Sequence, residues 1–571
     1  MGALTKVVPA LEWIATYRRA DLRGDLTSGV IVAIMLIPQG MAYAMLAGLP
    51  PVMGLYAATA PLIAYVLLGS SRQLAVGPVA MMSLLVFAGC SSLAPPGSAD
   101  YVASATLLAL MVGIGQVALG VFRMGFLVNF VSHAVISGFT SASAIVICIS
   151  QLKHLLGIDL PAGHSVFPIL LEAGRRIGET NPYALAIGLV SIAALAAFRR
   201  KAPHFPAAIL VVVGGTLLVY VFHLREMGVK TVGAVPQGLP GLSLPVLDFA
   251  TIRSLVPTAL VILFVGYMES ISVARWIAAR ECYDVSPNRE FVGLGLANVA
   301  ASLVSGYPVT GGFSRTAVNY QAGARTGLAS VITAVLVMLT LLVLTPLFYY
   351  LPNAVLAAII MVAVIGLIDI AEAKRLFALK KTDGGVLTLT FIATLTIGLE
   401  QGILSGVGLS LLLFIWRSAH PHTAELGYLE DEGVFRNLDR FPQAKTFPGV
   451  LMLRVDASLY FANMGFIENL LRKRLEEKPE TKCVLFDLSG VNAMDAVAVR
   501  ALERIMEDYA ARQIAFAFAA MKGPVRDLVS RAGWQEKYPE SQYTSLHQAL
   551  DAITGASGSA RPVSKSSSRD I

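Results

Sequence analysis

The stretch Gly306-Tyr-Pro-Val-Thr-Gly-Gly-Phe-Ser-Arg-Thr-Ala-Val-Asn319 interrupts a strongly apolar region of the chain. It contains a proline, paired glycines, a serine and an arginine, although apolar residues surround it. In hydrocarbon such a break is tolerated only where it lines a cavity, because unsatisfied backbone groups and charges are costly there. A helix that starts near Phe313 or Ser314 would direct its free N–H groups and its partial positive charge into that cavity. The stretch therefore predicts an anion site.

A second break, Leu74-Ala-Val-Gly-Pro-Val-Ala-Met-Met-Ser83, lies much earlier in the chain. Interrupted segments at corresponding places in two halves of a membrane protein are the best sequence indication of a transporter's binding site. We therefore expect the anion to lie between the facing ends of two half-helices, which start near Val79 and Ser314.

Composition places the chain among polytopic membrane proteins. Of its 571 residues, 56% are hydrophobic and 14% are charged, and the mean hydropathy is +0.68. The net charge of +7 comes from basic residues scattered between apolar runs, which favours loop bias over a nucleic-acid surface. The four cysteines are not closely spaced, so no disulfide framework or zinc site is predicted. The sequence has no P-loop, which argues against an ATP-driven pump.

The apolar runs form two series of seven, separated by a polar, Pro/Gly-rich stretch at 223–248. They cover residues 26–45, 52–68, 78–89, 102–120, 126–150, 183–198 and 205–222, then 254–273, 291–305, 314–322, 328–350, 353–370, 385–399 and 401–416. A full span needs about 20 apolar residues, so the third run of each series is too short to cross as a helix. An extended segment buried in protein could complete each short run. Seven plus seven predicts an inverted repeat, because an odd number of spans reverses the second half.

The loop charges predict that both termini are cytoplasmic. In that orientation the inside loops hold clusters such as Arg199-Arg200-Lys201 and Lys380-Lys381, whereas four of the outside loops contain no Lys or Arg. The other outside basic residues fall mostly in longer loops, where this rule is weaker. They are Lys153, Arg175, Arg176, Arg225, Lys230 and Arg253. We expect an integral protein of a bacterial-type inner (cytoplasmic) membrane.

The character of the chain changes after Trp416. Short β-rich runs at 450–455, 482–486 and 514–518 alternate with amphipathic helices at 462–477 and 496–511, which predicts a small soluble α/β domain. We expect an N-terminal cytoplasmic segment at 1–20, with an interfacial helix at 9–19. A transport domain follows at 21–418, with its two repeats at about 21–222 and 250–418. The soluble domain covers 425–555, and a disordered Ser/Gly-rich tail covers 556–571.

Five motifs follow one another along the membrane part of the chain. They are Ile37-Pro-Gln-Gly-Met-Ala-Tyr-Ala44, Pro51-Val-Met-Gly-Leu-Tyr56, Gly77-Pro-Val-Ala-Met-Met-Ser-Leu84, Gly266-Tyr-Met-Glu-Ser-Ile-Ser272 and Gly311-Gly-Phe-Ser-Arg-Thr-Ala317. With a STAS-like domain behind them, they resemble the SulP sulfate-permease family of anion transporters, whose relatives include prestin and pendrin. The resemblance covers residues from about Asp21 to about Gly555. It implies a polytopic α-helical membrane protein with fourteen membrane segments in two inverted seven-segment repeats, arranged as core and gate bundles, plus a C-terminal cytoplasmic α/β STAS domain. It also implies a homodimer with an elevator-like movement.

The soluble domain carries the run Phe486-Asp-Leu-Ser-Gly-Val-Asn-Ala-Met-Asp495, which resembles the STAS signature. Asp495 is expected to cap the helix at 496–511. Stand-alone STAS regulators carry a phosphorylatable serine directly after this aspartate, whereas Ala496 stands here. We therefore expect docking, dimerisation or assembly rather than a phosphoserine switch.

Ser314 and Arg315 open the second half-helix. In the functional interpretation, the Ser314 hydroxyl and backbone N–H groups bind an oxyanion while Arg315 supplies positive charge. The anion site of the resembling family matches both positions. In the alternative, Arg315 pairs with a carboxylate and Ser314 only caps the helix. Whether Arg315 touches the anion or only contributes to the local field stays open.

Gln39 and Tyr43 stand four residues apart, so one helix face presents both, close to the break at Pro38. In the resembling family these positions border the substrate, together with the start of the third span, here Val79 and Ala80. Without that resemblance, Gln39 would more often be a buried amide bonded to a neighbouring helix.

Glu269 is the one acidic residue squarely inside an apolar run of the sequence. An intramembrane carboxylate is a functional candidate by default. Members of the resembling family place an acidic residue here for sodium or proton coupling, and the sodium-coupled bicarbonate members add a hydroxyl residue four positions later. Val273 stands at that position, although Ser270 or Ser272 could replace the hydroxyl. We favour H+ over Na+; the alternative is a structural ion pair with Arg315.

These features predict a secondary active transporter and not an enzyme, with no catalytic residues, organic cofactor or metal. The expected substrate is a small oxyanion such as sulfate, bicarbonate or a dicarboxylate, moved by proton-coupled symport. The expected partners are the anion, membrane lipids and a second copy of the chain, without nucleic acid. Two alternatives remain: a nucleobase (uracil-type) proton symporter of the same design, and an anion channel or exchanger without coupling.

Overall fold

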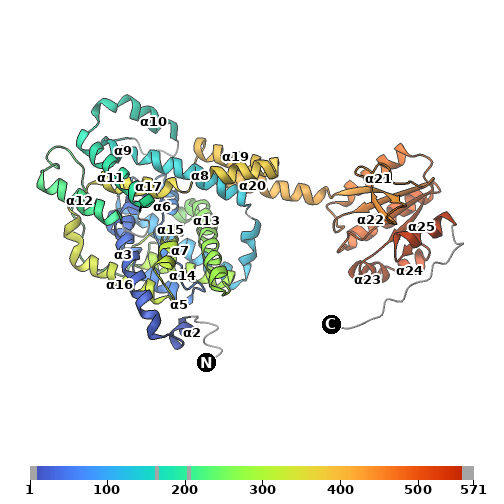
Figure 1. Cartoon of the computed structure of the whole chain (residues 1–571), viewed down its shortest axis with the longest axis horizontal. Helices are drawn as coiled ribbons and strands as arrows, with labels where there is room; N and C mark the ends of the chain where they lie inside the picture. The colour runs from blue at the N-terminus through green and yellow to red at the C-terminus, as the bar shows by residue number, and fades with distance from the viewer. Residues whose placement is uncertain (1–9, 131, 161–165, 202–206, 556–571) are drawn as a thin grey trace. The chain divides into compact units, whose positions relative to one another are not determined.

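The computed structural model describes residues 10–130, 132–160, 166–201 and 207–555. The chain divides into two compact units with the boundary between residues 411 and 412 (Figure 1). The expected disordered tail, 556–571, lies outside the described residues, as do the first nine residues of the expected N-terminal segment.

The first half of the membrane unit consists of helices around two chain breaks. Its elements are α2 (Ala10–Ala15), α3 (Arg19–Leu46), α4 (Pro51–Tyr56), α5 (Ala60–Leu68), β1 (Val76–Gly77), α6 (Ala80–Cys90), α7 (Ala99–Val121), η1 (Met124–Phe130), α8 (His133–Ser150), α9 (Leu152–Leu156), α10 (Val166–Arg175), η2 (Ile177–Glu179), α11 (Pro182–Lys201) and α12 (Ala207–Val221).

The second half repeats this plan. Its elements are α13 (Phe249–Glu281), α14 (Pro287–Leu303), β2 (Thr310–Gly311), α15 (Phe313–Gln321), α16 (Leu328–Leu339), η3 (Thr340–Leu344), η4 (Thr345–Phe348), α17 (Asn353–Ile365), α18 (Ile370–Leu379), α19 (Lys381–Thr396) and α20 (Leu399–Ala419). In the described part of the chain, nine helical segments are long and apolar enough to cross a membrane. The third helix of each half is short as predicted, since α6 has 11 residues and α15 has 9.

The break predicted at Pro38 is wrong, because α3 continues through this residue. Two other prolines explain departures from the predicted spans. The run 52–68 is divided into α4 and α5, because Pro61 lacks an N–H group and disfavours helical backbone before it. The run 328–350 leaves α-helical geometry after α16 and continues as η3 and η4, where Pro346 lies. Three further helices, α9, α10 and α18, lie where the sequence predicted loops.

The membrane helices pack as two bundles. In the first bundle, formed by α3–α7 and α13–α16, α14 packs against α7 and α5, and α15 and α16 pack against α3. In the second bundle, formed by α8–α12 and α17–α19, α8 packs against α19 and α17, and α11 packs against α17 and α12. The bundles contact one another where α3 meets α17 and α12 and where α6 meets α8. Both chain breaks therefore belong to the first bundle.

Two buried carboxylates hold the loops of the first bundle. Asp25 Oδ1 accepts hydrogen bonds from the backbone N–H groups of Arg325 (2.7 Å) and Thr326 (3.0 Å). Glu290 accepts from the Tyr65 hydroxyl (2.8 Å) and from the backbone N–H of Ser70 (2.7 Å). Both carboxylates are 0% exposed, so these hydrogen bonds offset their loss of hydration. They fix the loops that precede α16 and β1.

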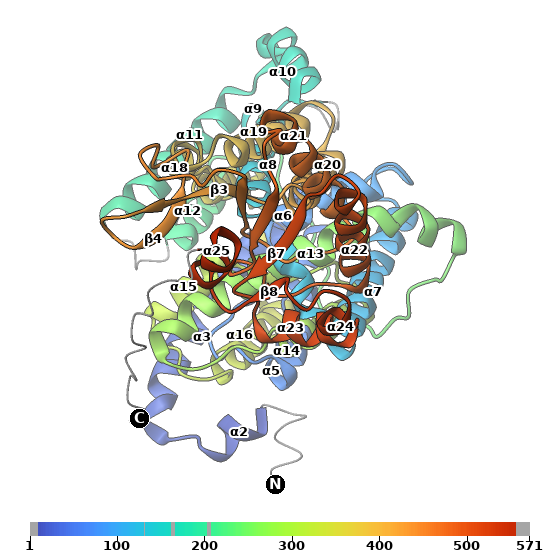
Figure 2. The ribbon, with the colours of Figure 1, turned by 90° about the vertical axis from the view of Figure 1, so that its right-hand side faces the viewer.

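The second unit is an α/β domain. Its elements are β3 (Thr423–Leu429), β4 (Val434–Asn437), β5 (Val450–Val455), α21 (Met464–Glu477), β6 (Cys483–Asp487), α22 (Ala496–Ala510), β7 (Ala515–Ala519), α23 (Gly523–Arg531), α24 (Trp534–Lys537), β8 (Gln542–Tyr543) and α25 (Leu546–Thr554). The sheet order is β4-β3-β5-β6-β7-β8, and β5 to β8 run parallel. The three predicted strands and two predicted helices are confirmed, each within two residues at either end. Figure 2 shows α22 and α25 on opposite sides of the sheet, where each covers its own apolar cluster.

Asp495 caps α22 as predicted. Its Oδ1 accepts from the N–H of Ala498 (2.7 Å), and its Oδ2 accepts from the N–H of Phe461 (3.0 Å). Loss of an N-cap costs about 0.5–2 kcal/mol. We expect Asp495→Ala to speed amide hydrogen exchange in α22 of the full chain by about 5- to 30-fold, the range that 1–2 kcal/mol gives.

The exposed Asp508 on the same helix provides the control, because Asp508→Ala removes a carboxylate without removing a cap. Equal exchange rates in Asp495→Ala and wild type would show that the cap does not stabilise α22.

Candidate anion-binding site

The two chain breaks lie side by side as a two-stranded antiparallel sheet. Val76 pairs with Gly311 and Gly77 pairs with Thr310. The N–H of Gly312 extends the pairing by donating to the carbonyl oxygen of Ala75 (3.1 Å). This pairing satisfies backbone groups that a break in a membrane helix would leave without partners. The expected extended segments are confirmed, whereas their mutual pairing was not predicted.

Each strand leads directly into a half-helix. Val79 is the N-cap of α6 and Gly312 is the N-cap of α15, and neither forms a side-chain cap. The first N–H groups of both helices therefore keep free donor capacity, and both helix ends carry partial positive charge. The alternative in which Ser314 caps the second helix is wrong, because Gly312 occupies that position.

Arg315 connects the two half-helix starts. Its side chain is buried (3% exposed), and Nη1 donates to the carbonyl oxygen of Pro78, the residue before the N-cap of α6. A Cβ atom added at Gly77 would lie 3.4 Å from Arg315 Nη2, and one added at Gly312 would lie 3.1 Å from it. The guanidinium therefore reaches from α15 to the entrance of α6 and fills the space that these two glycines leave.

Two further donors of this guanidinium, Nε and Nη2, are buried and form no hydrogen bond with another of the described residues. Glu269 acts on the charge of Arg315, yet within the described residues the two side chains do not form a direct ion pair. Tyr43 and Tyr307 are also close enough to act on that charge. Among the described residues, Arg315 thus holds its positive charge inside the first bundle without a direct ion pair.

Glu269 lies on α13 next to the strand pair. It is half-buried, and its Oε2 atom is buried without a hydrogen-bond partner. The next residue, Ser270, fixes α13 to β2: its Oγ accepts from the N–H of Gly311 (2.8 Å) and bonds to the Thr310 hydroxyl (2.7 Å). The position of Glu269 relative to the break is therefore set by the side-chain hydrogen bonds of the next residue, Ser270.

The two predicted residues of α3 lie near the same break. Gln39 and Tyr43 are 8% and 6% exposed. On the same helix, Leu36 Cδ1 would lie 3.6 Å from a Cβ atom added at Gly77. The Gln39 amide forms no hydrogen bond with another residue of the described ranges, so it does not bond to a neighbouring helix there. Val79 is half-buried and Ala80 is 3% exposed at the start of α6.

Ser314 and Arg315 occupy different environments although they are neighbours. Ser314 is exposed, as is Phe313 (52%), whose ring lies 6.0 Å from that of Trp276. Arg315 is buried behind the strand pair. The Ser314 side chain therefore lies at the surface of the first bundle, whereas the Arg315 side chain lies inside it.

Sequence reasoning missed several residues that support the site. Asn298 is fully buried, and its side chain holds both the N–H (2.8 Å) and the carbonyl oxygen (3.0 Å) of Val309. The buried Tyr307 hydroxyl bonds to Ser83 of α6 (3.2 Å). Asn298 could have been found as a polar residue inside an apolar run, and Tyr307 lies within the break itself.

A broken-helix membrane unit joined to an α/β domain defines an integral membrane transport protein. The model of the Sulfate permease family matches residues 22–390, and that of the STAS domain matches residues 441–549. The chain belongs to the sulfate permease family and carries a C-terminal STAS domain, as the motifs predicted.

Relatives and solved structures agree with this assignment. Sulfate transporter 4.1, chloroplastic, of Arabidopsis thaliana is 40% identical and aligns over 95% of this chain and 82% of that protein. High affinity sulfate transporter 2 of Stylosanthes hamata is 34% identical and aligns over 91% of this chain and 82% of that protein. The structure of the murine Slc26a9 anion transporter, solved in the inward-facing state, matches 97% of this chain and 95% of its own, with a TM-score of 0.90 and 26% identity.

The transmembrane domain of the cyanobacterial bicarbonate transporter BicA shares the fold. It matches 69% of this chain and 98% of its own, with a TM-score of 0.60 and 24% identity.

Proposed function

We propose that the chain is a secondary active transporter of small oxyanions, with sulfate as its principal substrate and protons as the coupling ion. The buried guanidinium of Arg315, with two donors free, carries this proposal because it lies between two uncapped half-helix starts. Two helix N-termini and one full positive charge suit a compact anion better than a neutral nucleobase. The names of the relatives, which are sulfate transporters, support sulfate.

The proposal gives each predicted residue a role. The Ser314 hydroxyl and the first N–H groups of α6 and α15 bind the oxyanion, and Gln39 and Tyr43 add side-chain hydrogen bonds. Val79 and Ala80 leave the start of α6 open because their side chains are small and carry no acceptor. The positive charge of Arg315 attracts the anion electrostatically. Its hydrogen bond to the carbonyl oxygen of Pro78 holds the two half-helices together.

Glu269 is the proposed coupling group. A sulfate dianion entering beside one arginine and one carboxylate would bring like charges together, so a proton on Glu269 favours anion binding. Sodium finds few ligands here. The Ser270 hydroxyl is engaged with β2, the Ser272 hydroxyl donates to the carbonyl oxygen of Met268 (2.7 Å), and Val273 has no oxygen.

The proposed cycle moves the first bundle relative to the second in an elevator-like manner. The helices that carry the site residues, α3, α6, α13 and α15, all belong to the first bundle, so the site can travel as one body. We also propose fourteen membrane segments on the repeat pattern, and both termini in the cytoplasm on the loop charges. A homodimer is proposed on membership of the family, together with residence in a bacterial-type inner membrane.

Uptake of labelled sulfate into proteoliposomes, with and without an acidic exterior, tests this function. We expect uptake above that of empty vesicles and a faster initial rate with acid outside. Competition with bicarbonate, fumarate and uracil ranks the substrates. Displacement by uracil but not by unlabelled sulfate would favour the nucleobase alternative, and conductance beyond carrier rates would favour a channel. Uptake equal to that of empty vesicles would contradict anion transport.

Gly77 offers a test of the strand pair. Its φ of +149° is strained for other residues, and an added Cβ would lie 3.4 Å from Arg315 Nη2. We expect Gly77→Ala to lower both thermal stability and sulfate uptake, since such backbone strain costs about 1–3 kcal/mol.

Gly97→Ala is the matched control, because Gly97 has a φ of +81° and no atom near the added Cβ. It should lower stability by a similar amount and leave the half-saturating sulfate concentration unchanged. If both variants transport alike, the Gly77–Arg315 contact does not matter for transport.

A further inference from the structure

A small cavity lies between the two bundles, and two helices of the candidate site, α3 and α6, contribute to its lining. Its volume is about 40 Å³, room for about three waters by the usual requirement of 10–15 Å³ each. Residues of both bundles line it: Met45, Leu84 and Phe87 from the first, and Val146, Ser150 and Lys153 from the second. The cavity therefore lies on the surface along which the proposed movement takes place.

The cavity follows the candidate site along two helices. Met45 comes two residues after Tyr43 on α3. On α6, Leu84 lies one turn and Phe87 two turns beyond Ala80, about 10 Å along the axis at 1.5 Å per residue. In the proposed topology this end of α6 leads to the outside. An anion arriving from outside would thus pass the cavity before it reaches the half-helix starts.

Among the described residues that line the cavity, Lys153 is the one with a charged side chain. It is half-buried and forms no ion pair or side-chain hydrogen bond with another residue in the described part of the chain. Most of its surroundings in the cavity are apolar. An ammonium group in such a place is costly unless an anion compensates it.

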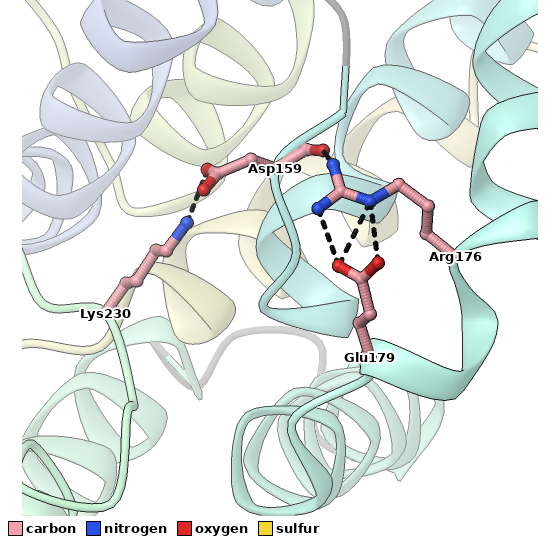
Figure 3. A network of polar contacts seen from close by, with 4 residues as sticks. All are labelled: Asp159, Arg176, Glu179 and Lys230. Atoms are coloured by element: carbon pink, nitrogen blue, oxygen red, sulfur yellow. Dashed lines mark hydrogen bonds and ion pairs between the residues drawn. The ribbon is translucent and has the colours of Figure 1, made fainter.

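The nearest carboxylate is engaged elsewhere. Asp159 acts on the charge of Lys153, but its Oδ1 forms an ion pair with Lys230 (2.5 Å). Figure 3 shows this pair together with Arg176, which donates to the carbonyl oxygen of Asp159 and binds Glu179 through Nε and Nη2. Asp159 is thus paired with Lys230, and Lys153 has no direct carboxylate partner among the described residues.

We propose that Lys153, with the cavity between the bundles, forms an outer subsite for an inorganic oxyanion. The inference rests on the proposed function and adds to it a second binding position on the outer path. Lys153 supplies an ammonium, and Gln151 supplies its second amide N–H, since the first donates to Ser150 Oγ (3.0 Å). The Ser150 hydroxyl itself donates to the carbonyl oxygen of Ile147 (2.7 Å). An anion held there has lost part of its hydration before it reaches Ser314.

The subsite predicts an effect on one side of the membrane only. In proteoliposomes selected for a single orientation, Lys153→Gln and Lys153→Met should raise the half-saturating external sulfate concentration about tenfold, the equivalent of about 1.4 kcal/mol. The half-saturating internal concentration for efflux should stay as in wild type. Lys153→Arg, which keeps the charge, should stay close to wild type for both.

Arg175→Gln is the matched control. Arg175 is an exposed cation of α10 (69% exposed) and does not line the cavity, although Ile169 of the same helix does. Equal shifts for uptake and efflux, or an equal shift in Arg175→Gln, would overturn the outer subsite while leaving transport itself intact. Wild-type vesicles without sulfate uptake would instead contradict the proposed function.

Discussion

Glu269→Gln is expected to abolish proton-driven accumulation of sulfate. Each proton moved down a gradient of one pH unit is worth about 1.4 kcal/mol, or about tenfold accumulation, and glutamine cannot carry that proton. Wild-type vesicles should therefore concentrate sulfate about tenfold per pH unit for each coupled proton, and the variant should only equilibrate it. Sulfate–sulfate exchange should continue, because the half-helix starts and Arg315 are unchanged.

Glu281→Gln is the control for this prediction. Glu281 ends the same helix, α13, but binds the Tyr320 hydroxyl (2.7 Å) away from the strand pair. It should keep the gradient dependence of wild type. Glu269→Asp, which can still exchange a proton, should keep part of it. Gradient-driven accumulation in Glu269→Gln that matches wild type would place the coupling group elsewhere.

Arg315→Gln is expected to weaken sulfate binding by about 10- to 150-fold. A hydrogen bond that involves a charged group contributes about 1.5–3 kcal/mol, which corresponds to this range of affinity. The variant loses the positive charge between the half-helices and the bond to the carbonyl oxygen of Pro78. Arg315→Lys keeps the charge but not the planar donor set, so it should fall between the two.

The concentration dependence of sulfate uptake measures this effect, and Arg325→Gln is its control. Arg325 follows α15 on an exposed loop (59% exposed), where it pairs with Glu281 (3.6 Å). Its removal should leave the half-saturating sulfate concentration near that of wild type. Unchanged sulfate affinity in Arg315→Gln would show that the anion does not depend on this charge.

The sequence predicted the breaks because their cause is local. Proline and glycine close together, as in Gly77-Pro78 and Gly311-Gly312, disfavour a continuous helix, so the starts of α6 and α15 could be placed within a residue. The pairing of β1 with β2 could not be predicted in the same way. A strand of two residues has no measurable alternation, and its partner lies more than 230 residues away.

The candidate site was predicted in its members but not in its geometry. Neighbouring positions such as Ser314 and Arg315 look equally available in a sequence, yet tertiary contacts expose one and bury the other. Arg315 finds its partner, Pro78, 237 residues away. Asp25 and Glu290 likewise bind loops 300 and 220 residues distant, which no local pattern reveals.

Several elements of the STAS domain were predicted correctly, because local sequence patterns mark them. The predicted strand at 450–455 and the start of α22 at Ala496 match the structure, because long apolar runs and a capping aspartate mark them. The strands β3, β4 and β8 and the helices α23, α24 and α25 were not predicted. The strands β4 and β8 have four and two residues, too few for a period to appear.

The location of selenate, a sulfate analogue that scatters X-rays anomalously, tests the central claim most directly. Diffraction from crystals grown with selenate, at concentrations that compete with sulfate uptake, should show an anomalous peak within hydrogen-bond distance of Ser314 Oγ, between the first residues of α6 and α15. The peak should be lost in Arg315→Gln. A selenate peak elsewhere in the membrane unit, with these half-helix starts unoccupied, would contradict the account.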